Sequence, residues 1–268
     1  MKTAGVIGWP IAHSKSPLIH RFWLQALGID GDYARFLVRP EDIGAAVRAL
    51  PALGLAGVNV TVPHKLAVME HLDVVDAVAR AIGAVNTVVC EGGRLLGTNT
   101  DMSGFLEPLT PAPVGHAVVV GAGGAARAVL LGLKSLGVEH VTLMNRSVER
   151  ASALLDALEV PGHAVGLKMP LPPAELVVNA SSLGMVGQPP LDLDLRSLPV
   201  GATVYDIVYA PLETRLLAAA RAGGFRCIDG LEMLVGQAAV AFALFFGVKP
   251  PRALDSELRA LLVRGGTG

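Results

Sequence analysis

Short apolar runs alternate with amphipathic stretches along most of the chain, beginning in the first hundred residues. The expected strands lie at residues 3–8, 33–38 and 57–62, and the expected helices at 16–27 and 41–50. Ser16 is placed to cap the first of these helices, with Pro17 in its first turn. Strands that alternate with helices in this way predict parallel pairing through crossover helices.

The alternation stops between residues 84 and 97, where two apolar segments flank Glu91-Gly92-Gly93. A Gly-Gly pair in that position predicts a β-hairpin. Pro and Gly are then frequent at 108–115, which indicates a linker between domains.

A second series of elements follows this linker. Its expected strands lie at 116–120, 140–144, 175–179, 204–208 and 225–228, and its expected helices at 125–136, 148–158 and 212–222. This order predicts a doubly wound α/β domain. Two further helices are expected near 231–246 and 251–263, with no strand after them.

Composition excludes several classes of protein. The chain is 52% hydrophobic and 17% charged, which is not the composition of a disordered protein. Its 22 basic and 23 acidic residues give a net charge of −1, so we expect no nucleic-acid partner. The mean hydropathy is +0.53, but the uncharged segment 233–248 is shorter than the about 20 residues that a bilayer requires, and we expect a buried helix and no membrane contact.

Two further features of composition concern location and metal binding. The N-terminus lacks the pattern of a signal peptide, which favours a cytoplasmic protein. Cys90 and Cys227 are too few for a disulfide framework or a zinc cluster, so we expect no metal.

A glycine-rich segment at 121–126 matches G-x-G-x-x-[G/A] between an apolar strand and a helical segment. The first glycine permits a sharp turn, the second lets backbone amides approach a pyrophosphate, and the small last residue lets helix and strand pack closely. The helix N-terminus adds partial positive charge there. The motif predicts a dinucleotide site; a purely structural strand–helix turn is the alternative. The expected contacts are Gly121, Ala122, Gly123, Gly124 and Ala125.

The end of the next expected strand indicates which dinucleotide is bound. NAD sites usually carry a carboxylate there, whereas NADP sites carry a cation for the 2′-phosphate. Here Asn145-Arg146-Ser147 follows the strand, with Arg150 one helical turn later. Arginine offers paired donors to phosphate, so the sequence favours NADP. The alternative is that Arg146 is an ordinary solvated loop residue.

Polar residues gather at the ends of elements in the first hundred residues. Asn59 and Thr61 point to one side of a strand, and Lys65 is expected in the first turn of the following helix. A cation at that end opposes the helix dipole, and such a local inconsistency often marks function. Asn86 stands at the start of the expected hairpin, and Asp101 follows the hairpin. The alternative for Asp101 is a purely structural role as the cap of the next helix. Together these groups suit a small ligand that carries hydroxyls and a carboxylate.

Taken in order from about residue 5 to residue 247, these segments resemble the shikimate dehydrogenase family. The segments are Ser14-Lys-Ser16-Pro, Asn59-Val-Thr61-x-Pro-His-Lys65, Gly-Ala-x-Asn86-Thr, Gly-x-Asn-Thr-Asp101, Gly-Ala-Gly-Gly-Ala-Ala, Asn145-Arg146 and Gly230-Leu-Glu-Met-Leu-Val-x-Gln237. The resemblance implies NADPH-dependent interconversion of 3-dehydroshikimate and shikimate, in the pathway to chorismate and the aromatic amino acids. It also implies an active site between two α/β domains, in a monomer or homodimer.

The implied domains are an N-terminal α/β substrate domain and a Rossmann-like, doubly wound NADP-binding domain. The first comprises 1–101 and 237–268, because the final helices return to it, and the second comprises 102–236.

The family's site residues carry over to matching positions of this chain. For the substrate they are Ser14 and Ser16 at the carboxylate, Thr61, Asn86 and Asp101 at the ring hydroxyls, Asn59 in support, Tyr209 closing over the ring, and Gln237. For the cofactor, the resemblance adds two residues to those given above: Ile207, beside the nicotinamide, and Gly230. Ser181 stands where the family more often has Thr, and both carry a hydroxyl.

The implied mechanism centres on Lys65 paired with Asp101. Reducing the ketone places negative charge on the oxygen at C3, which an ammonium group can stabilise and protonate. A lysine in water is protonated at neutral pH, so Lys65 is assigned as the proton donor, with Asp101 orienting it.

Three alternatives differ in function. They are a quinate/shikimate dehydrogenase that prefers NAD, a non-catalytic NADP-binding module, and a folate-type or glutamyl-tRNA reductase-like enzyme. Lys65 and Asp101 argue against the second, while Ser14, Ser16 and Gln237 argue against the third.

Overall fold

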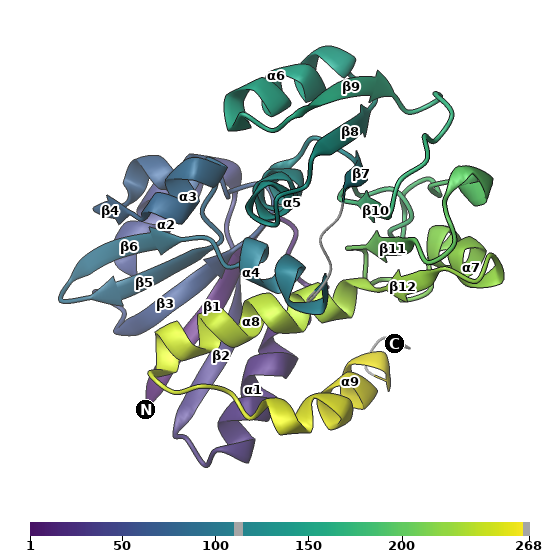
Figure 1. Cartoon of the computed structure of the whole chain (residues 1–268). Helices are drawn as coiled ribbons and strands as arrows, with labels where there is room; N and C mark the ends of the chain where they lie inside the picture. The colour runs from purple at the N-terminus through teal and green to yellow at the C-terminus, as the bar shows by residue number, and fades with distance from the viewer. Residues whose placement is uncertain (110–114, 265–268) are drawn as a thin grey trace. The chain divides into compact units, whose positions relative to one another are not determined.

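The computed structural model describes residues 1–109 and 115–264, which form two compact units (Figure 1). The first unit comprises Met1–Thr100 and Leu234–Gly268, and the second comprises Asp101–Met233. Most of the expected linker, residues 110–114, lies outside the described part of the chain.

The first unit contains a mixed six-stranded sheet in the order β2-β1-β3-β5-β6-β4. Its strands are β1 (Lys2–Gly8), β2 (Gly31–Leu37), β3 (Leu55–Val60), β4 (Val74–Val75), β5 (Thr87–Glu91) and β6 (Arg94–Thr98). β1 runs parallel to β2 and β3, whereas β5 runs antiparallel to β3 and β6. The β5–β6 hairpin is confirmed, and its turn glycines Gly92 and Gly93 have φ of 56° and 78°, as a tight hairpin turn requires.

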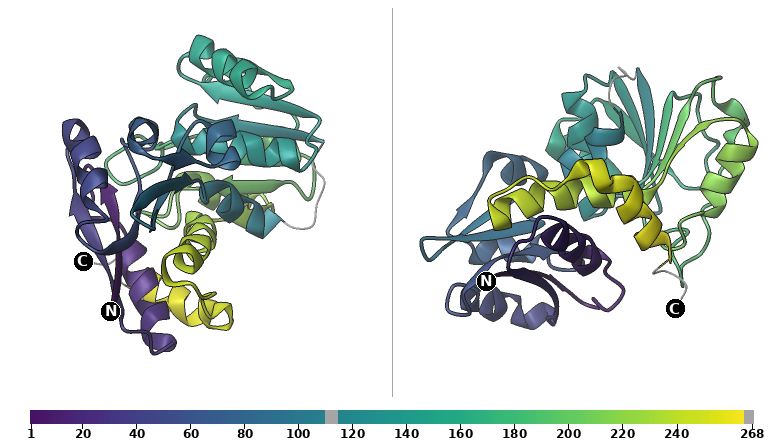
Figure 2. Two further views of the ribbon diagram at one scale, coloured as in Figure 1. Left: turned by 90° about the vertical axis from the view of Figure 1, so that its left-hand side faces the viewer. Right: turned by 90° about the horizontal axis from the view of Figure 1, so that it is seen from below.

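Helices cover both faces of this sheet. The helical elements of the first unit are α1 (Ser16–Ala26), η1 (Pro40–Asp42), α2 (Ile43–Ala49), η2 (Ala67–His71), α3 (Ala77–Ile82), most of α8 (Gly230–Phe246), η5 (Arg252–Leu254) and α9 (Asp255–Arg264). Apolar residues of α2, η2 and α3 form one core cluster with Val58, Val60 and Val88. On the other face, α1 contacts β2, and α9 lies beside α1 (Figure 2).

The second unit contains a parallel six-stranded sheet in the order β12-β11-β10-β7-β8-β9. Its strands are β7 (His116–Val120), β8 (His140–Asn145), β9 (Gly162–Gly166), β10 (Leu176–Asn179), β11 (Thr203–Asp206) and β12 (Arg226–Ile228). Counted within this unit, the order is that of a dinucleotide-binding sheet, in which the order of strands along the chain reverses between β7 and β10 while all strands stay parallel. The expected doubly wound fold is confirmed.

Two apolar clusters fill the two faces of the second sheet. Its helical elements are α4 (Asp101–Leu106), η3 (Glu107–Leu109), α5 (Gly124–Ser135), α6 (Val148–Leu158), η4 (Leu195–Ser197) and α7 (Arg215–Ala222). Val119 and Val178 pack with residues of α4, α5 and α6, whereas Val118 and Val177 pack with residues of α7. Consecutive strand residues thus face opposite layers, as buried parallel strands require.

Two local predictions are wrong. Lys65 does not lie in an α-helix: residues 62–66 form turns, and the 3₁₀-helix η2 starts at Ala67. The Lys65 carbonyl accepts from the Val85 N–H at 2.8 Å instead of continuing a helical ladder. The helix-dipole argument for Lys65 therefore fails.

Ser16 is also not a cap. It is the first residue of α1, and Lys15 occupies the N-cap position without a side-chain bond. The Ser16 N–H donates instead to Ser14 Oγ at 3.3 Å, so the hydroxyl that serves the start of this helix belongs to Ser14.

Candidate active site

A buried hydrogen-bond network joins the polar ends of β3, β5 and β6 in the first unit. Asn59 Nδ2 donates to Thr87 Oγ1 at 2.9 Å, and Thr87 Oγ1 donates to Asn86 Oδ1 at 2.9 Å. Asn86 Oδ1 also accepts from the Thr100 N–H at 2.8 Å, while its Nδ2 donates to Thr100 Oγ1 at 3.0 Å. All four residues are at most 6% exposed. A satisfied network of this kind rigidifies the strand ends that carry it.

The backbone next to this network carries each of the two predicted catalytic residues. Lys65 is held through its carbonyl by Val85, the residue before Asn86. Asp101 directly follows Thr100, begins α4 and is 6% exposed. Thr61, which precedes the Lys65 turn, is tied to β1 by its N–H bond to the Ile7 carbonyl at 2.9 Å.

The two serines of the N-terminal segment lie together. Ser14 Oγ donates to Ser16 Oγ at 3.3 Å, and both residues are buried. The Arg35 guanidinium on β2 donates to the Ser14 carbonyl from Nε at 3.0 Å and from Nη2 at 2.6 Å. Arg35 received no role from the sequence, because a solvent-exposed arginine on a strand gives no sign of a distant backbone partner.

The predicted Gly-rich turn has the geometry that a dinucleotide requires. Gly121 has φ of 105°, and a Cβ there would lie 2.9 Å from the Cβ of Ser181. Gly123 is the N-cap of α5, and a Cβ there would meet no described atom within 4 Å. That side of the turn is open to a ligand, as backbone approach to a pyrophosphate demands. Ala126 is fully buried, which allows the close packing expected of the last small residue.

The end of β8 presents cations, together with a carboxylate that the sequence interpretation overlooked. Arg146 and Arg150 are both exposed. Ser147 caps α6 by accepting from the Arg150 N–H at 3.2 Å, and its hydroxyl donates to Glu149 Oε2 at 3.0 Å. The first turn of α6 thus brings a carboxylate, that of Glu149, back to Ser147. Asn145 Nδ2 closes the turn by donating to the Ser147 carbonyl at 2.8 Å.

A buried aspartate at the end of β11 is a second residue without a role in the sequence interpretation. Asp206 accepts from Thr214 Oγ1 at 2.6 Å, from Asn179 Nδ2 at 2.9 Å and from the Val208 N–H at 3.0 Å. Burial raises the pKa of Asp206, although the hydrogen bond from Thr214 favours its charged form. The carboxylate thereby fixes the turn that carries Ile207.

Three further residues predicted for the site lie in this loop or in α8. Tyr209 is half-buried in the same loop as Ile207. A Cβ on Gly230 would collide with the Ile207 carbonyl, so only glycine permits this approach. Gln237 is 8% exposed, and its Nε2 donates to the Leu234 carbonyl at 2.8 Å within α8.

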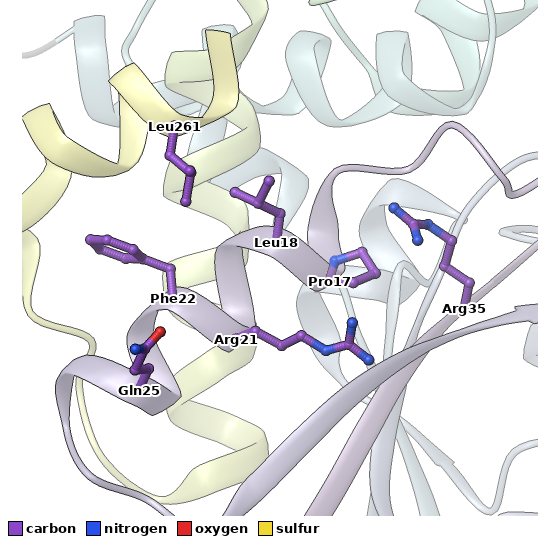
Figure 3. A pocket seen from close by; sticks show the side chains of 7 residues that line it. All are labelled: Pro17, Leu18, Arg21, Phe22, Gln25, Arg35 and Leu261. Carbon is purple, nitrogen blue, oxygen red and sulfur yellow. The ribbon is translucent and has the colours of Figure 1, made fainter. Parts of the chain in front are cut away.

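A pocket of about 350 Å³ lies elsewhere in the first unit, beside α1, β2 and α9 (Figure 3). Phe22 and Leu261 lie at one end and Arg35 at the other. None of the predicted site residues lines it.

Within residues 1–109 and 115–264, no helix is long and apolar enough to cross a membrane. The same residues contain no group of three or more His, Cys, Asp or Glu side chains arranged to hold a metal ion.

Comparison with known protein families gives three matches along the chain. Residues 6–88 match the shikimate dehydrogenase substrate binding domain, residues 112–181 match shikimate / quinate 5-dehydrogenase, and residues 230–255 match the shikimate 5′-dehydrogenase C-terminal domain.

Individual relatives agree with these matches. Shikimate dehydrogenase (NADP(+)) of Sphingopyxis alaskensis is 55% identical over 97% of this chain and 96% of its own. The Thermus thermophilus shikimate 5-dehydrogenase, solved with NADP(H) and shikimate, is 39% identical with a TM-score of 0.89, covering 98% of this chain and 100% of its own. Quinate dehydrogenase from Corynebacterium glutamicum, solved with NAD, is 34% identical with a TM-score of 0.90, covering 97% and 99%. The resemblance seen in the motifs is confirmed: the chain belongs to the shikimate dehydrogenase family.

Proposed function

We propose that this chain catalyses the reversible reduction of 3-dehydroshikimate to shikimate with NADPH, in the pathway to chorismate and the aromatic amino acids. The observation that carries this proposal is the buried network around Asn86, which anchors the backbone beside Lys65 and immediately before Asp101. Relatives at 54–55% identity bear the name shikimate dehydrogenase (NADP(+)), and their chains match almost the full length of this one.

The residues of the first unit suit a small ligand with a carboxylate and ring hydroxyls. The Ser14 and Ser16 hydroxyls would bind the carboxylate, while Thr61 and Asn86 would bind ring hydroxyls. The Asn59 amide nitrogen donates to Thr87 Oγ1 and to the Asn86 carbonyl, which supports a role for Asn59 in holding its neighbours. Gln237 on α8 and Tyr209 complete the proposed substrate contacts.

The second unit suits NADP. Gly121, Ala122, Gly123, Gly124 and Ala125 would hold the pyrophosphate at the start of α5; Asn145, Arg146, Ser147 and Arg150 would hold the 2′-phosphate; and Ile207 and Gly230 would flank the nicotinamide. When bound, the cofactor supplies the hydride. An exposed guanidinium is a suitable phosphate partner because its paired donors match the phosphate oxygens.

Lys65 and Asp101 would manage the proton. During reduction, negative charge develops on the oxygen at C3 of the substrate. We assign to Lys65 Nζ the donation of a proton to that oxygen, and to Asp101 the orientation of the Lys65 ammonium and a hydrogen bond with the substrate. In the oxidation direction Lys65 accepts the same proton. The proposal places this reaction in the cytoplasm and in a monomer or homodimer.

An NAD-dependent quinate/shikimate dehydrogenase is the second candidate. It is favoured by the Glu149 carboxylate beside Ser147, because a carboxylate at this strand end repels a 2′-phosphate.

One kinetic comparison distinguishes the two. The purified protein is assayed with shikimate or quinate, each with NADP or NAD, by following absorbance of the reduced nicotinamide. We expect kcat/KM to be highest for shikimate with NADP, by about tenfold or more over the other pairs, which corresponds to about 1.4 kcal/mol of transition-state stabilisation. A higher value for quinate with NAD selects the second candidate, and no turnover with any pair overturns both.

A further inference from the structure

The serine loop, residues 14–16, leads into α1 and is held from two distant parts of the first unit. The Arg35 guanidinium of β2 donates to the Ser14 carbonyl from Nε at 3.0 Å and from Nη2 at 2.6 Å. On the other side of Ser14 along the chain, Lys15 Nζ donates to the Leu262 carbonyl of α9 at 2.7 Å. The backbone that carries both serine hydroxyls therefore has a fixed place.

The Lys15 bond joins this loop to the end of α9. Leu262 lies in the last turn of that helix, where carbonyl groups lack partners within the helix. A lysine ammonium satisfies one of these carbonyls and is favoured at the negative end of the helix dipole. This contact holds the serine loop independently of Arg35.

Arg35 reaches the loop from the edge of the sheet. It shares a face of β2 with Tyr33, two positions earlier, whose buried hydroxyl donates to Asn59 Oδ1 at 2.6 Å. β2 is the edge strand, and the Arg35 side chain is exposed. A substitution of Arg35 therefore leaves the apolar core of the first unit intact.

Two arginines line the pocket of about 350 Å³ beside α1, and their charges are balanced differently (Figure 3). Arg21 pairs with Asp32, with 2.6 Å between Nε and Oδ1 and 3.3 Å between Nη2 and Oδ2. Arg35 has no carboxylate partner among the described residues, and its guanidinium bonds the Ser14 carbonyl instead. A carbonyl oxygen carries only a partial negative charge, so Arg35 leaves net positive charge at the serine loop.

We propose that Arg35 is a positioning residue that makes the serine loop select an anionic carboxylate over a neutral group. This inference rests on the proposed function, which takes the Ser14 and Ser16 hydroxyls as the contacts of the substrate carboxylate. A hydroxyl can donate to a carboxylate or to the carbonyl of an ester, so the two serines accept either group. The charge that Arg35 brings to the loop stabilises the anion alone, and Arg35 acts through Ser14, whose carbonyl it holds.

Comparing shikimate with its methyl ester tests the proposal, because the ester keeps the ring hydroxyls and replaces the charged carboxylate with a neutral group. In Arg35→Gln we expect kcat/KM for shikimate to fall about tenfold, mostly through KM, while that for the ester changes less than about twofold. The KM for NADP should stay within about twofold. If the ester is not turned over, its inhibition constant against shikimate replaces its kcat/KM in the comparison.

Three companion variants sharpen this experiment. Arg35→Lys keeps the charge without the paired donors, and its preference for shikimate over the ester should lie between those of the wild type and Arg35→Gln. Arg21→Gln removes an arginine of the same pocket whose charge Asp32 already balances, and should leave the kinetics of both compounds unchanged. Arg35→Met gives the same readout as Arg35→Gln if thermal unfolding shows that the glutamine variant is not folded.

The outcomes separate charge selection from a merely structural role. An equal loss with shikimate and its ester in Arg35→Gln overturns the proposal, as does an unchanged preference for shikimate, or an equally large change in Arg21→Gln. A wild-type protein that oxidises shikimate with NADP while Arg35→Gln behaves identically contradicts only the role of Arg35. A wild-type protein without that activity contradicts the proposed function, and the role of Arg35 fails with it.

Discussion

Asn86 and Thr100 are joined by reciprocal bonds: the Thr100 N–H donates to Asn86 Oδ1 at 2.8 Å, and Asn86 Nδ2 donates to Thr100 Oγ1 at 3.0 Å. A side chain just before β5 thereby fixes Thr100, the residue that precedes Asp101. The predicted substrate contact therefore anchors the residue next to the predicted catalytic Asp101.

Asn86→Ala should therefore reduce both activity and stability. The Thr100 N–H loses its partner inside the protein, which costs about 1–3 kcal/mol and lowers the melting temperature by several degrees. We expect kcat/KM for shikimate to fall about a hundredfold. Asn86→Asp keeps an acceptor for the Thr100 N–H and should recover part of the melting temperature. If thermal scans and steady-state kinetics of Asn86→Ala match those of the wild type, this assignment is wrong.

Arg146 should determine the preference for NADP over NAD. Arg146→Ala is expected to raise the KM for NADP about tenfold to a hundredfold, since a charge-assisted bond to phosphate contributes about 1.5–3 kcal/mol. The KM for NAD should hardly change, because NAD lacks the 2′-phosphate. Arg94→Ala, an exposed arginine in the β5–β6 hairpin, is the control. Equal changes with both cofactors would remove Arg146 from phosphate recognition.

Glu149 should weaken the binding of NADP, whereas Arg146 should strengthen it. Backbone and Ser147 hydrogen bonds lower the pKa of its carboxyl, so the group is charged at neutral pH. Glu149→Gln removes a charge that repels the 2′-phosphate, and we expect the KM for NADP to fall about twofold to threefold at low salt. The effect should shrink as ionic strength rises, because the group is exposed. A higher KM for NADP in this variant would show that Glu149 supports binding.

Periodicity predicted the second unit well because its four inner strands are continuous apolar runs buried on both faces, as in His116–Val120 and Leu176–Asn179. It missed β9, Gly162–Gly166, which pairs only with β8 at the sheet edge and carries few large apolar residues. It also mistook the segment after Pro63 for an α-helix, because apolar spacing does not reveal that Val85 engages the Lys65 carbonyl.

Motifs predicted the residues that would bear the chemistry but missed side chains that hold the backbone around them. Ser14 and Ser16, two residues apart in the chain, form a recognisable sequence motif. Tyr33, Arg35 and Asp206 act through partners that are distant in sequence or through backbone groups, and no sequence motif marks them. Only the folded structure shows those partners.

The buried His20 should make stability depend on pH. Burial lowers the pKa of His20 to about 3, so the folded protein keeps the neutral ring while the unfolded chain takes up a proton below about pH 6.5. The resulting contribution to stability is present above that pH and is lost as pH falls towards 3. One such proton gives a slope of up to about 1.4 kcal/mol per pH unit.

Denaturant unfolding between about pH 7 and pH 4 measures this slope. The free energy of unfolding of His20→Phe should fall less steeply with decreasing pH than that of the wild type, by about 1 kcal/mol per unit. His13→Gln changes an exposed histidine and should run parallel to the wild type. Parallel curves for His20→Phe and the wild type would show that His20 is not kept neutral by the fold.

The central claim is that Lys65 supplies and receives the proton at the reacting oxygen, and steady-state oxidation of shikimate with NADP by Lys65→Ala tests it most directly. We predict that kcat falls by about a hundredfold to ten-thousandfold while the KM for shikimate changes less than tenfold, because the lost interaction belongs to the transition state. A Lys65→Ala protein that is folded and retains a kcat close to that of the wild type would contradict the claim.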